Sequence, residues 1–190
     1  MEGPYFVDEK LNRTDIRSDP ANGQAKAGAP LALTMLVSRV TANECRPISG
    51  AQVDLWQCDA AGIYSDVNDP QFNTVGQKFL RGYQTADASG AVRFLTVYPG
   101  WYPGRTVHLH FKIRTDPKAQ RGYDFTSQLY FDDALTDRVH AAEPYAARGK
   151  RNARNRDDGI FRQGGDQLML DVTESRGTYS ASFAIGLQIP

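Results

Sequence analysis

Hydrophobic and polar residues alternate along most of this chain. A two-residue period is typical of strands with one buried face, and no window of helical length carries an apolar stripe at a period of 3.6 residues. We therefore expect an all-β fold, a β-sandwich of about eight mainly antiparallel strands with long loops. The strands are predicted at residues 31–40, 51–59, 79–85, 91–97, 106–114, 126–131, 167–173 and 179–187.

The connections between these strands carry distinct turn chemistry. Asp87-Ala88-Ser89-Gly90 joins two alternating runs and predicts a short hairpin loop with glycine in a left-handed conformation. The segment Pro99–Gly104 encloses two large aromatic residues between two Pro-Gly pairs, so it predicts a rigid turn that serves either packing or a site. Short helical turns are expected within 132–137 and 141–149.

The first 30 residues lack an apolar period, and we expect an extended arm packed on a single domain of residues 31–190. A chain of 190 residues is long enough to bury a substantial core. It shows neither the features of a signal peptide nor a run of 18 apolar residues, so we expect a soluble protein that does not enter a membrane. The compartment and the oligomeric state stay open.

Composition and charge narrow the classes of partner. Basic and acidic residues both number 22, so no net basic field draws the chain to nucleic acid or to an anionic membrane. Five basic residues fall within 148–156 without interleaved aromatic residues, which favours a solvated loop, with an anion-binding patch as the alternative. Cys45 and Cys58 are either a disulfide or two buried thiols.

Two of the three histidines lie two positions apart in a predicted strand. Residues at this spacing share a face, so His108 and His110 point the same way and can bind one metal ion. A cupin-like carboxylate ligand is missing, because Ile113 and Arg114 occupy the positions where it would stand. Phenolate oxygen from tyrosine is a credible ligand instead, since a trivalent ion depresses the phenol pKa. The third histidine, His140, lies in a polar segment and is expected to be exposed.

Several motifs occur in an order that resembles the intradiol ring-cleavage dioxygenases, which include catechol 1,2-dioxygenases and protocatechuate 3,4-dioxygenases. The motifs are EGPYF at 2–6, PISGAQVDLWQCDAAGIYS at 47–65, the aromatic Pro-Gly turn, and GRTVHLH at 104–110. The similarity runs from residue 2 to beyond residue 131 and concerns the catalytic domain alone. The resemblance does not extend to the helical region through which catechol 1,2-dioxygenases dimerise. It therefore predicts no oligomeric state.

The resemblance implies a non-haem Fe(III) centre with one iron per chain. Tyr64 would be the equatorial phenolate and Tyr102 the axial one. His108 would be the axial imidazole and His110 the equatorial imidazole, with a solvent hydroxide in the fifth position.

It also implies the reaction, in which a catechol and O2 give a cis,cis-muconate by cleavage between the hydroxyl-bearing carbons. The catechol would displace Tyr102, which then becomes a candidate base. Arg105 would face the bound ring and stabilise negative charge there, and Gln128 would lie near the substrate.

Two other functions are compatible with the residues alone. One is a non-catalytic β-sandwich that serves as a carrier or binding module, in which the histidines and aromatic residues only pack. The other is a zinc hydrolase that uses His108, His110 and an aspartate. The short spacing between Tyr102 and His108 suggests an open pocket, and the identity of the catechol stays open.

Overall fold

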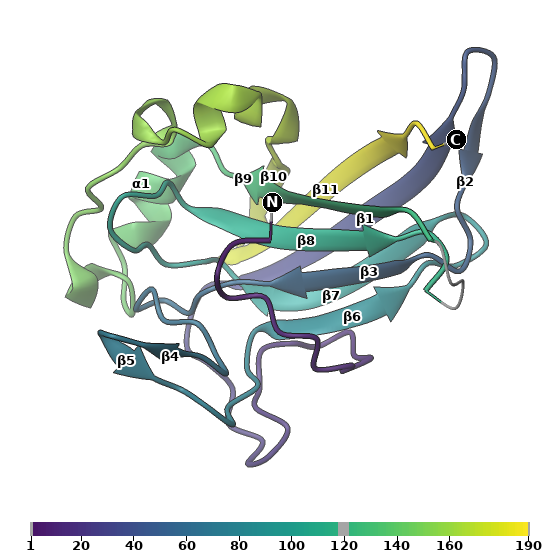
Figure 1. Ribbon diagram of the computed structural model, residues 1–190. Helices are drawn as coiled ribbons and strands as arrows, with labels where there is room; N and C mark the ends of the chain where they lie inside the picture. The colour runs from purple at the N-terminus through teal and green to yellow at the C-terminus, as the bar shows by residue number, and fades with distance from the viewer. Residues whose placement is uncertain (1, 118–121, 190) are drawn as a thin grey trace.

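The computed structural model describes residues 2–117 and 122–189, which form a sandwich of two β-sheets (Figure 1). The first sheet has the order β10-β11-β1-β2, with β7 also paired to β1, and the second has the order β6-β3-β8-β9. All pairings are antiparallel except that of β1 with β11, which is parallel. The all-β prediction is therefore confirmed.

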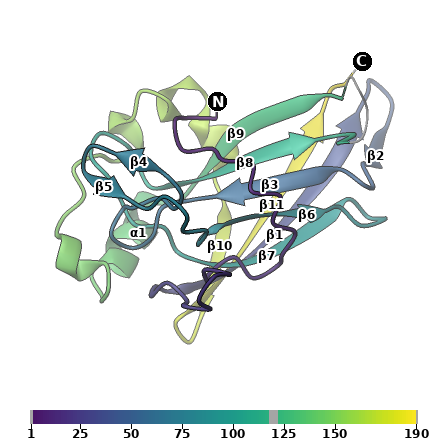
Figure 2. The same ribbon diagram turned by 60° about the horizontal axis from the view of Figure 1, so that its bottom comes forward.

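The strands of the first sheet are β1 (Pro30–Val40), β2 (Cys45–Pro47), β7 (Ala91–Val97), β10 (Asp171–Ser175) and β11 (Thr178–Leu187). Those of the second sheet are β3 (Gln52–Trp56), β6 (Arg81–Thr85), β8 (His108–Arg114) and β9 (Asp124–Tyr130), and β4 (Asn68–Asp69) pairs with β5 (Phe72–Asn73). The helical elements are α1 (Asp133–His140), η1 (Ala146–Arg148), η2 (Asn155–Asp157), η3 (Phe161–Gln163) and η4 (Gly165–Leu168). Both views place α1, β4 and β5 at one end of the sandwich (Figures 1 and 2).

Each predicted strand has an observed counterpart, although some bounds differ. The strand expected at 167–173 begins only at Asp171, because 3₁₀ turn η4 occupies the residues before it. The strand expected at 51–59 ends at Trp56, and Tyr64 lies in the irregular segment that follows.

The prediction of a β-hairpin at Asp87–Gly90 is wrong. The turn itself is present, since the Asp87 N–H donates to Ala91 O at 3.0 Å and Gly90 has a φ of 78°. However, β6 pairs with β3 and β7 pairs with β1, so the turn is a corner that carries the chain from one sheet to the other. Turn residues fix only the local reversal, whereas the burial of each strand's apolar face decides which strand it pairs with.

The core lies between the two sheets and is built from alternating side chains. Strand β1 contributes Leu31, Leu33, Met35 and Val37 from the first sheet. From the second sheet, β3 contributes Val53 and Leu55, and β8 contributes Leu109, Phe111 and Ile113. Burial of each large apolar side chain stabilises the fold by about 1.5–3 kcal/mol.

Part of the N-terminal segment runs along one edge of each sheet, at β6 and β7. Asn12 forms a bridge with Tyr83 of β6, and Asp15 forms one with Leu95 of β7. We propose from these contacts that residues 1–30 act as an arm on a β-sandwich of residues 31–190. No helix in the described ranges has the length and apolar character needed to cross a membrane.

The two cysteines are separate free thiols. Cys45 is exposed on β2 and Cys58 is buried, so the structure shows no disulfide between them and only one of the two thiols is buried. Burial raises the pKa of the Cys58 thiol well above its usual value.

Substitution of Gly90 by alanine tests the corner between the sheets. An added Cβ would lie 2.4 Å from Val37 O, in addition to the cost of a left-handed φ. Gly50→Ala is the matched control, because Gly50 has a similar φ of 82° but no atom within 4 Å of an added Cβ. We expect a loss of about 1–2 kcal/mol in the free energy of unfolding for Gly50→Ala and about 3 kcal/mol or more for Gly90→Ala. Equal losses in urea unfolding would show that the close approach is unimportant.

Candidate active site

The outer face of the second sheet carries a row of buried polar and aromatic side chains. In the strand register, Arg81 of β6 pairs with Trp56 of β3, Trp56 with His110 of β8, and His110 with Gln128 of β9. Cross-strand partners project to the same face of a sheet. All four residues are only 2% exposed, so the loops and the N-terminal segment keep this outer face dry.

The two histidines of β8 meet on this face, as their spacing predicted. Their Nε2 atoms lie 3.1 Å apart. Nδ1 of His108 lies 2.6 Å from Thr106 O, and because a carbonyl only accepts, Nδ1 carries the proton and Nε2 keeps its lone pair. The His110 ring stacks on Trp56 with centroids 5.0 Å apart.

Both imidazoles are neutral at neutral pH. Burial, and then the nearby Arg105 guanidinium, lower the pKa of His108 to about 3. Burial and the neighbouring His108 lower the pKa of His110 well below its usual value. Neutral imidazole is the form that binds a metal ion, so this pair is ready to act as nitrogen ligands.

Two tyrosines complete the site from separate segments. Tyr102 comes from the Pro99–Gly104 turn, and its Oη lies 3.1 Å from His108 Nε2. Tyr64 is fully buried, and its ring centroid lies 6.1 Å from that of His110 and 5.8 Å from that of Tyr102. Burial raises the pKa of both phenols, and the neighbouring Tyr102 adds to the effect on Tyr64.

The Tyr64 hydroxyl has no hydrogen-bond partner among the described residues. A buried hydroxyl left in this way costs about 1–3 kcal/mol, unless another group binds it. Ligand bonds of about 2.1 Å place neighbouring ligand atoms about 3 Å apart. The 3.1 Å separations of Tyr102 Oη and His110 Nε2 from His108 Nε2 fit this spacing. Two imidazoles and the Tyr102 phenol therefore have the spacing of ligands to a trivalent metal ion, and the Tyr64 hydroxyl, which has no partner among the described residues, can supply a fourth donor.

No group of three or more His, Cys, Asp and Glu residues that could hold a metal occurs in residues 2–117 and 122–189. The zinc hydrolase considered above needs an aspartate beside His108 and His110, and the described residues do not supply one. The oxygen atom that contacts Nε2 of His108 belongs to Tyr102.

Arg105 and Gln128 also meet at the site. The Arg105 Nη2 donates to Gln128 Oε1 at 2.5 Å, and its Nε donates to Asp158 Oδ2 at 2.9 Å. Asp158 is 1% exposed and also accepts N–H groups from Thr106 and Ile160 at 3.0 and 2.7 Å. The guanidinium is thus held by a buried carboxylate that no local sequence pattern indicates.

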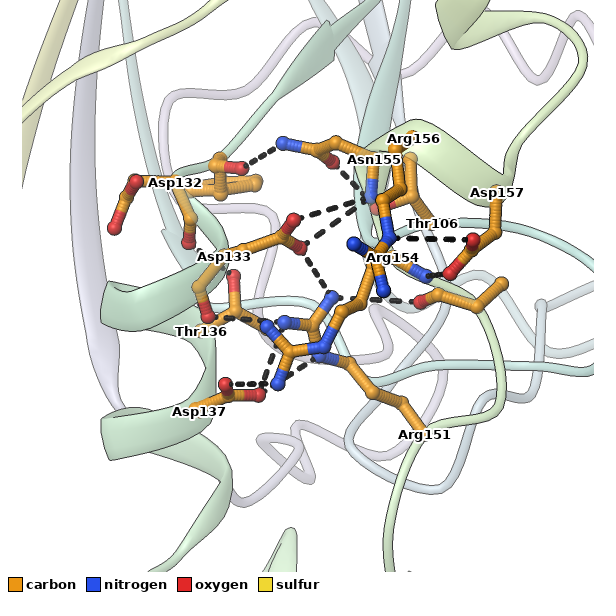
Figure 3. Close-up of polar contacts among 12 residues, drawn as sticks. Thr106, Asp132, Asp133, Thr136, Asp137, Arg151, Arg154, Asn155, Arg156 and Asp157 are labelled. Atoms are coloured by element: carbon orange, nitrogen blue, oxygen red, sulfur yellow. Dashed lines mark hydrogen bonds and ion pairs between the residues drawn. The ribbon is translucent and has the colours of Figure 1, made fainter.

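The basic segment 148–156 is solvated only in part, because Lys150, Arg154 and Arg156 are exposed whereas the Arg151 side chain is buried against α1. Arg151 donates to Asp133 at 2.5 Å and to Asp137 at 2.9 Å, and Arg154 donates to Asp137 at 2.6 Å (Figure 3). The two aspartates are four residues apart in α1 and therefore share one face of the helix. The Arg151 side chain is only 5% exposed as a result.

The same network continues toward the histidines. Asn155 donates to Phe131 O at 2.9 Å and accepts the Thr106 hydroxyl at 2.6 Å (Figure 3). Thr106 in turn supplies the carbonyl that orients His108.

His140, which was expected to be exposed, is half-buried. Its ring stacks on that of Tyr145 with centroids 4.9 Å apart, and its Nε2 lies 3.0 Å from Pro99 O.

Comparisons with known proteins agree with this arrangement. The family model Dioxygenase_C, described as Dioxygenase, matches residues 1–157. An intradiol ring-cleavage dioxygenase from Tetranychus urticae has a TM-score of 0.85 at 29% identity, over 98% of this chain and 91% of that chain. The chain belongs to the intradiol ring-cleavage dioxygenase family.

Relatives within this family differ in name and in length. The protocatechuate 3,4-dioxygenase beta chain of Burkholderia cepacia is 32% identical over 197 residues, which cover 97% of this chain and 76% of the relative. The hydroxyquinol 1,2-dioxygenase of Corynebacterium glutamicum is 30% identical over 129 residues, which cover 58% of this chain and 39% of the relative. Membership in this family identifies the chain as an oxidoreductase of the dioxygenase class. The alternative of a non-catalytic β-sandwich that serves as a carrier or binding module is therefore not supported.

Substitution of Asp158 by asparagine tests the anchor of Arg105. Burial acts to raise the pKa of Asp158, but the N–H groups of Thr106 and Ile160, together with Arg105, hold it below its usual value. A lowered pKa stabilises the fold above the unfolded value near 4, and this contribution disappears as the pH falls through the folded pKa.

We therefore expect Asp158→Asn to lower the free energy of unfolding by about 3 kcal/mol at pH 7, and by less below pH about 4. Asp166→Asn, at an exposed position, is the control and should change it by no more than about 0.5 kcal/mol. Urea unfolding at several pH values provides the measurement. A loss for Asp158→Asn that does not depend on pH would contradict the assignment.

Proposed function

We propose that this protein is a non-haem Fe(III) dioxygenase that cleaves a catechol between its two hydroxyl-bearing carbons to give a cis,cis-muconate. One ring carbon–carbon bond and the O–O bond break. Each new carboxylate then carries one oxygen from O2 and one from the catechol, so no further reductant is needed. The convergence of two imidazole nitrogens and two phenol oxygens in one dry site supports this proposal most directly.

Tyr64, Tyr102, His108 and His110 are the proposed ligands of one Fe(III) per chain. The neutral histidines and the orphaned Tyr64 hydroxyl support this set. When bound, the ferric ion draws electron density from a catecholate and makes its ring reactive toward O2.

The two tyrosines have different roles in the proposal. Tyr64 is fully buried between neighbouring aromatic rings, which suits a ligand that stays in place. Tyr102 is partly exposed on the Pro-Gly turn, which suits a side chain that moves aside when the catechol enters. As the phenolate that a bound ferric ion would favour, its Oη would then accept a proton from a catechol hydroxyl and act as a general base.

Arg105 and Gln128 form the proposed substrate-facing pair. Asp158 and Gln128 fix the Arg105 guanidinium, so its positive charge needs no reorganisation as negative charge develops on the ring. Burial of the histidines keeps water away and strengthens this electrostatic effect.

Reconstitution with Fe(III), followed by a panel of catechols, tests the function. The loaded protein should absorb visible light through tyrosinate-to-iron charge transfer and appear red to burgundy, whereas a zinc protein would be colourless. Catechol, protocatechuate and hydroxyquinol are then compared by O2 uptake and by the ultraviolet spectra of the products. The proposal is wrong if the protein stays colourless after iron loading. It is also wrong if the ring opens beside the hydroxyl-bearing carbons rather than between them.

Tyr102→Phe tests the departure of the axial tyrosine. Loss of a general base should lower kcat by about 10²–10⁴-fold while the iron content is maintained by the other ligands. Tyr123→Phe is the control, because Tyr123 is 40% exposed and should leave kcat unchanged. Full turnover by Tyr102→Phe with unchanged metal content would show that the assigned role is wrong.

A further inference from the structure

Arg81 is a buried cation at the start of β6 that the proposed chemistry does not use. It is 2% exposed, and none of the described carboxylates lies within ion-pair distance of its guanidinium. Burial of a charge is costly unless opposite charges and hydrogen bonds compensate it. Glu9 and Asp66 favour the Arg81 charge from beyond ion-pair distance, and Arg81 lies on the same cross-strand row as His110.

The guanidinium of Arg81 donates hydrogen bonds to two neighbours of Tyr64, which are Ser65 and Tyr5. Its Nε donates to Ser65 Oγ at 2.7 Å, and its Nη2 donates to Ser65 O. Its Nη1 donates to Tyr5 O at 3.2 Å. Ser65 follows Tyr64 in the chain, and the Tyr5 ring stacks on the Tyr64 ring with centroids 4.6 Å apart.

The backbone is strained on both sides of this contact. Leu80, directly before Arg81, has a φ of 53°, and Asp66, directly after Ser65, has a φ of 52°. A left-handed conformation at such residues costs about 1–3 kcal/mol and persists only where the surrounding structure requires it. The Leu80 N–H donates to Ile16 O at 2.7 Å, which helps to hold the bend that turns Arg81 inward.

Tyr64 depends on this frame because its own hydroxyl is not held by the described residues. Its carbonyl accepts the Thr74 hydroxyl at 2.7 Å, which fixes the backbone at one point. The ring direction is then set by the stack with Tyr5 and by the position of Ser65.

We propose that Arg81 is a positioning residue that holds the Tyr64 phenol in place beside His110, through Ser65 and Tyr5. This inference rests on the proposed function, in which Tyr64 is an iron ligand. Arg81 touches neither the substrate nor the donor atoms and acts only through these two neighbours.

Arg81→Met tests the proposal, with Arg13→Met as the matched control. Arg13 also donates to backbone carbonyls, those of Arg81, Ser18 and Lys78, but bonds neither Ser65 nor Tyr5. Each variant is loaded with Fe(III), and the dissociation constant, the energy of the tyrosinate-to-iron absorption band and urea unfolding are measured. We expect Arg81→Met to weaken Fe(III) binding by about 10–100-fold and to shift the band. Arg13→Met should lose stability but keep the wild-type band.

The possible results distinguish a failure of the positioning role of Arg81 from a failure of the proposed function. If wild-type protein binds no Fe(III), the proposed function fails and the positioning role fails with it. If wild-type protein binds iron and both variants keep its band and affinity, only the positioning role is overturned. Should Arg81→Met not fold, Ser65→Ala decides the question, because it removes one acceptor of Arg81, together with the hydrogen bond that the Ser65 hydroxyl donates to Phe79 O, and keeps the charge. A shifted band in Ser65→Ala supports the proposal, and an unchanged band overturns it.

Discussion

Strand β8 is buried on both faces, and the rest of the site depends on this constraint. Its inner face carries Leu109, Phe111 and Ile113 into the core, while its outer face carries His108 and His110 into a second dry layer. Most polar groups in such a layer need a hydrogen-bond partner, although Trp56 Nε1, Tyr64 Oη and His110 Nδ1 have none among the described residues. The surrounding loops therefore supply carbonyls, carboxylates and aromatic faces at defined positions.

The partners come from distant parts of the chain, so several separate segments hold the site residues in place. Thr106 orients His108, Asn155 binds the Thr106 hydroxyl, and Asp158 holds Arg105. Helix α1 fixes this loop in turn through its aspartates. Donor atoms held by several independent anchors are preorganised, and preorganisation is what electrostatic stabilisation of a developing charge requires.

Sequence reasoning recovered the parts of this arrangement that are local or carried by motifs. The two-residue period placed His108 and His110 on one face, and the motif order selected Tyr64 and Tyr102, which the fold brings beside them. It missed Asp158 and Arg81, because a long-range partner leaves no local pattern. It also misjudged the turn at Asp87–Gly90, since pairing between layers is decided by the whole core.

The N-terminal segment has a consequence for self-association. It bridges Tyr83 of β6 and Leu95 of β7, which are the strands that leave one side of each sheet without a neighbour. Open edges of this kind are templates for pairing with strands of other molecules. Because this segment occupies backbone hydrogen-bonding groups of β6 and β7, its proteolytic loss would leave both of these edges open to strand addition at once.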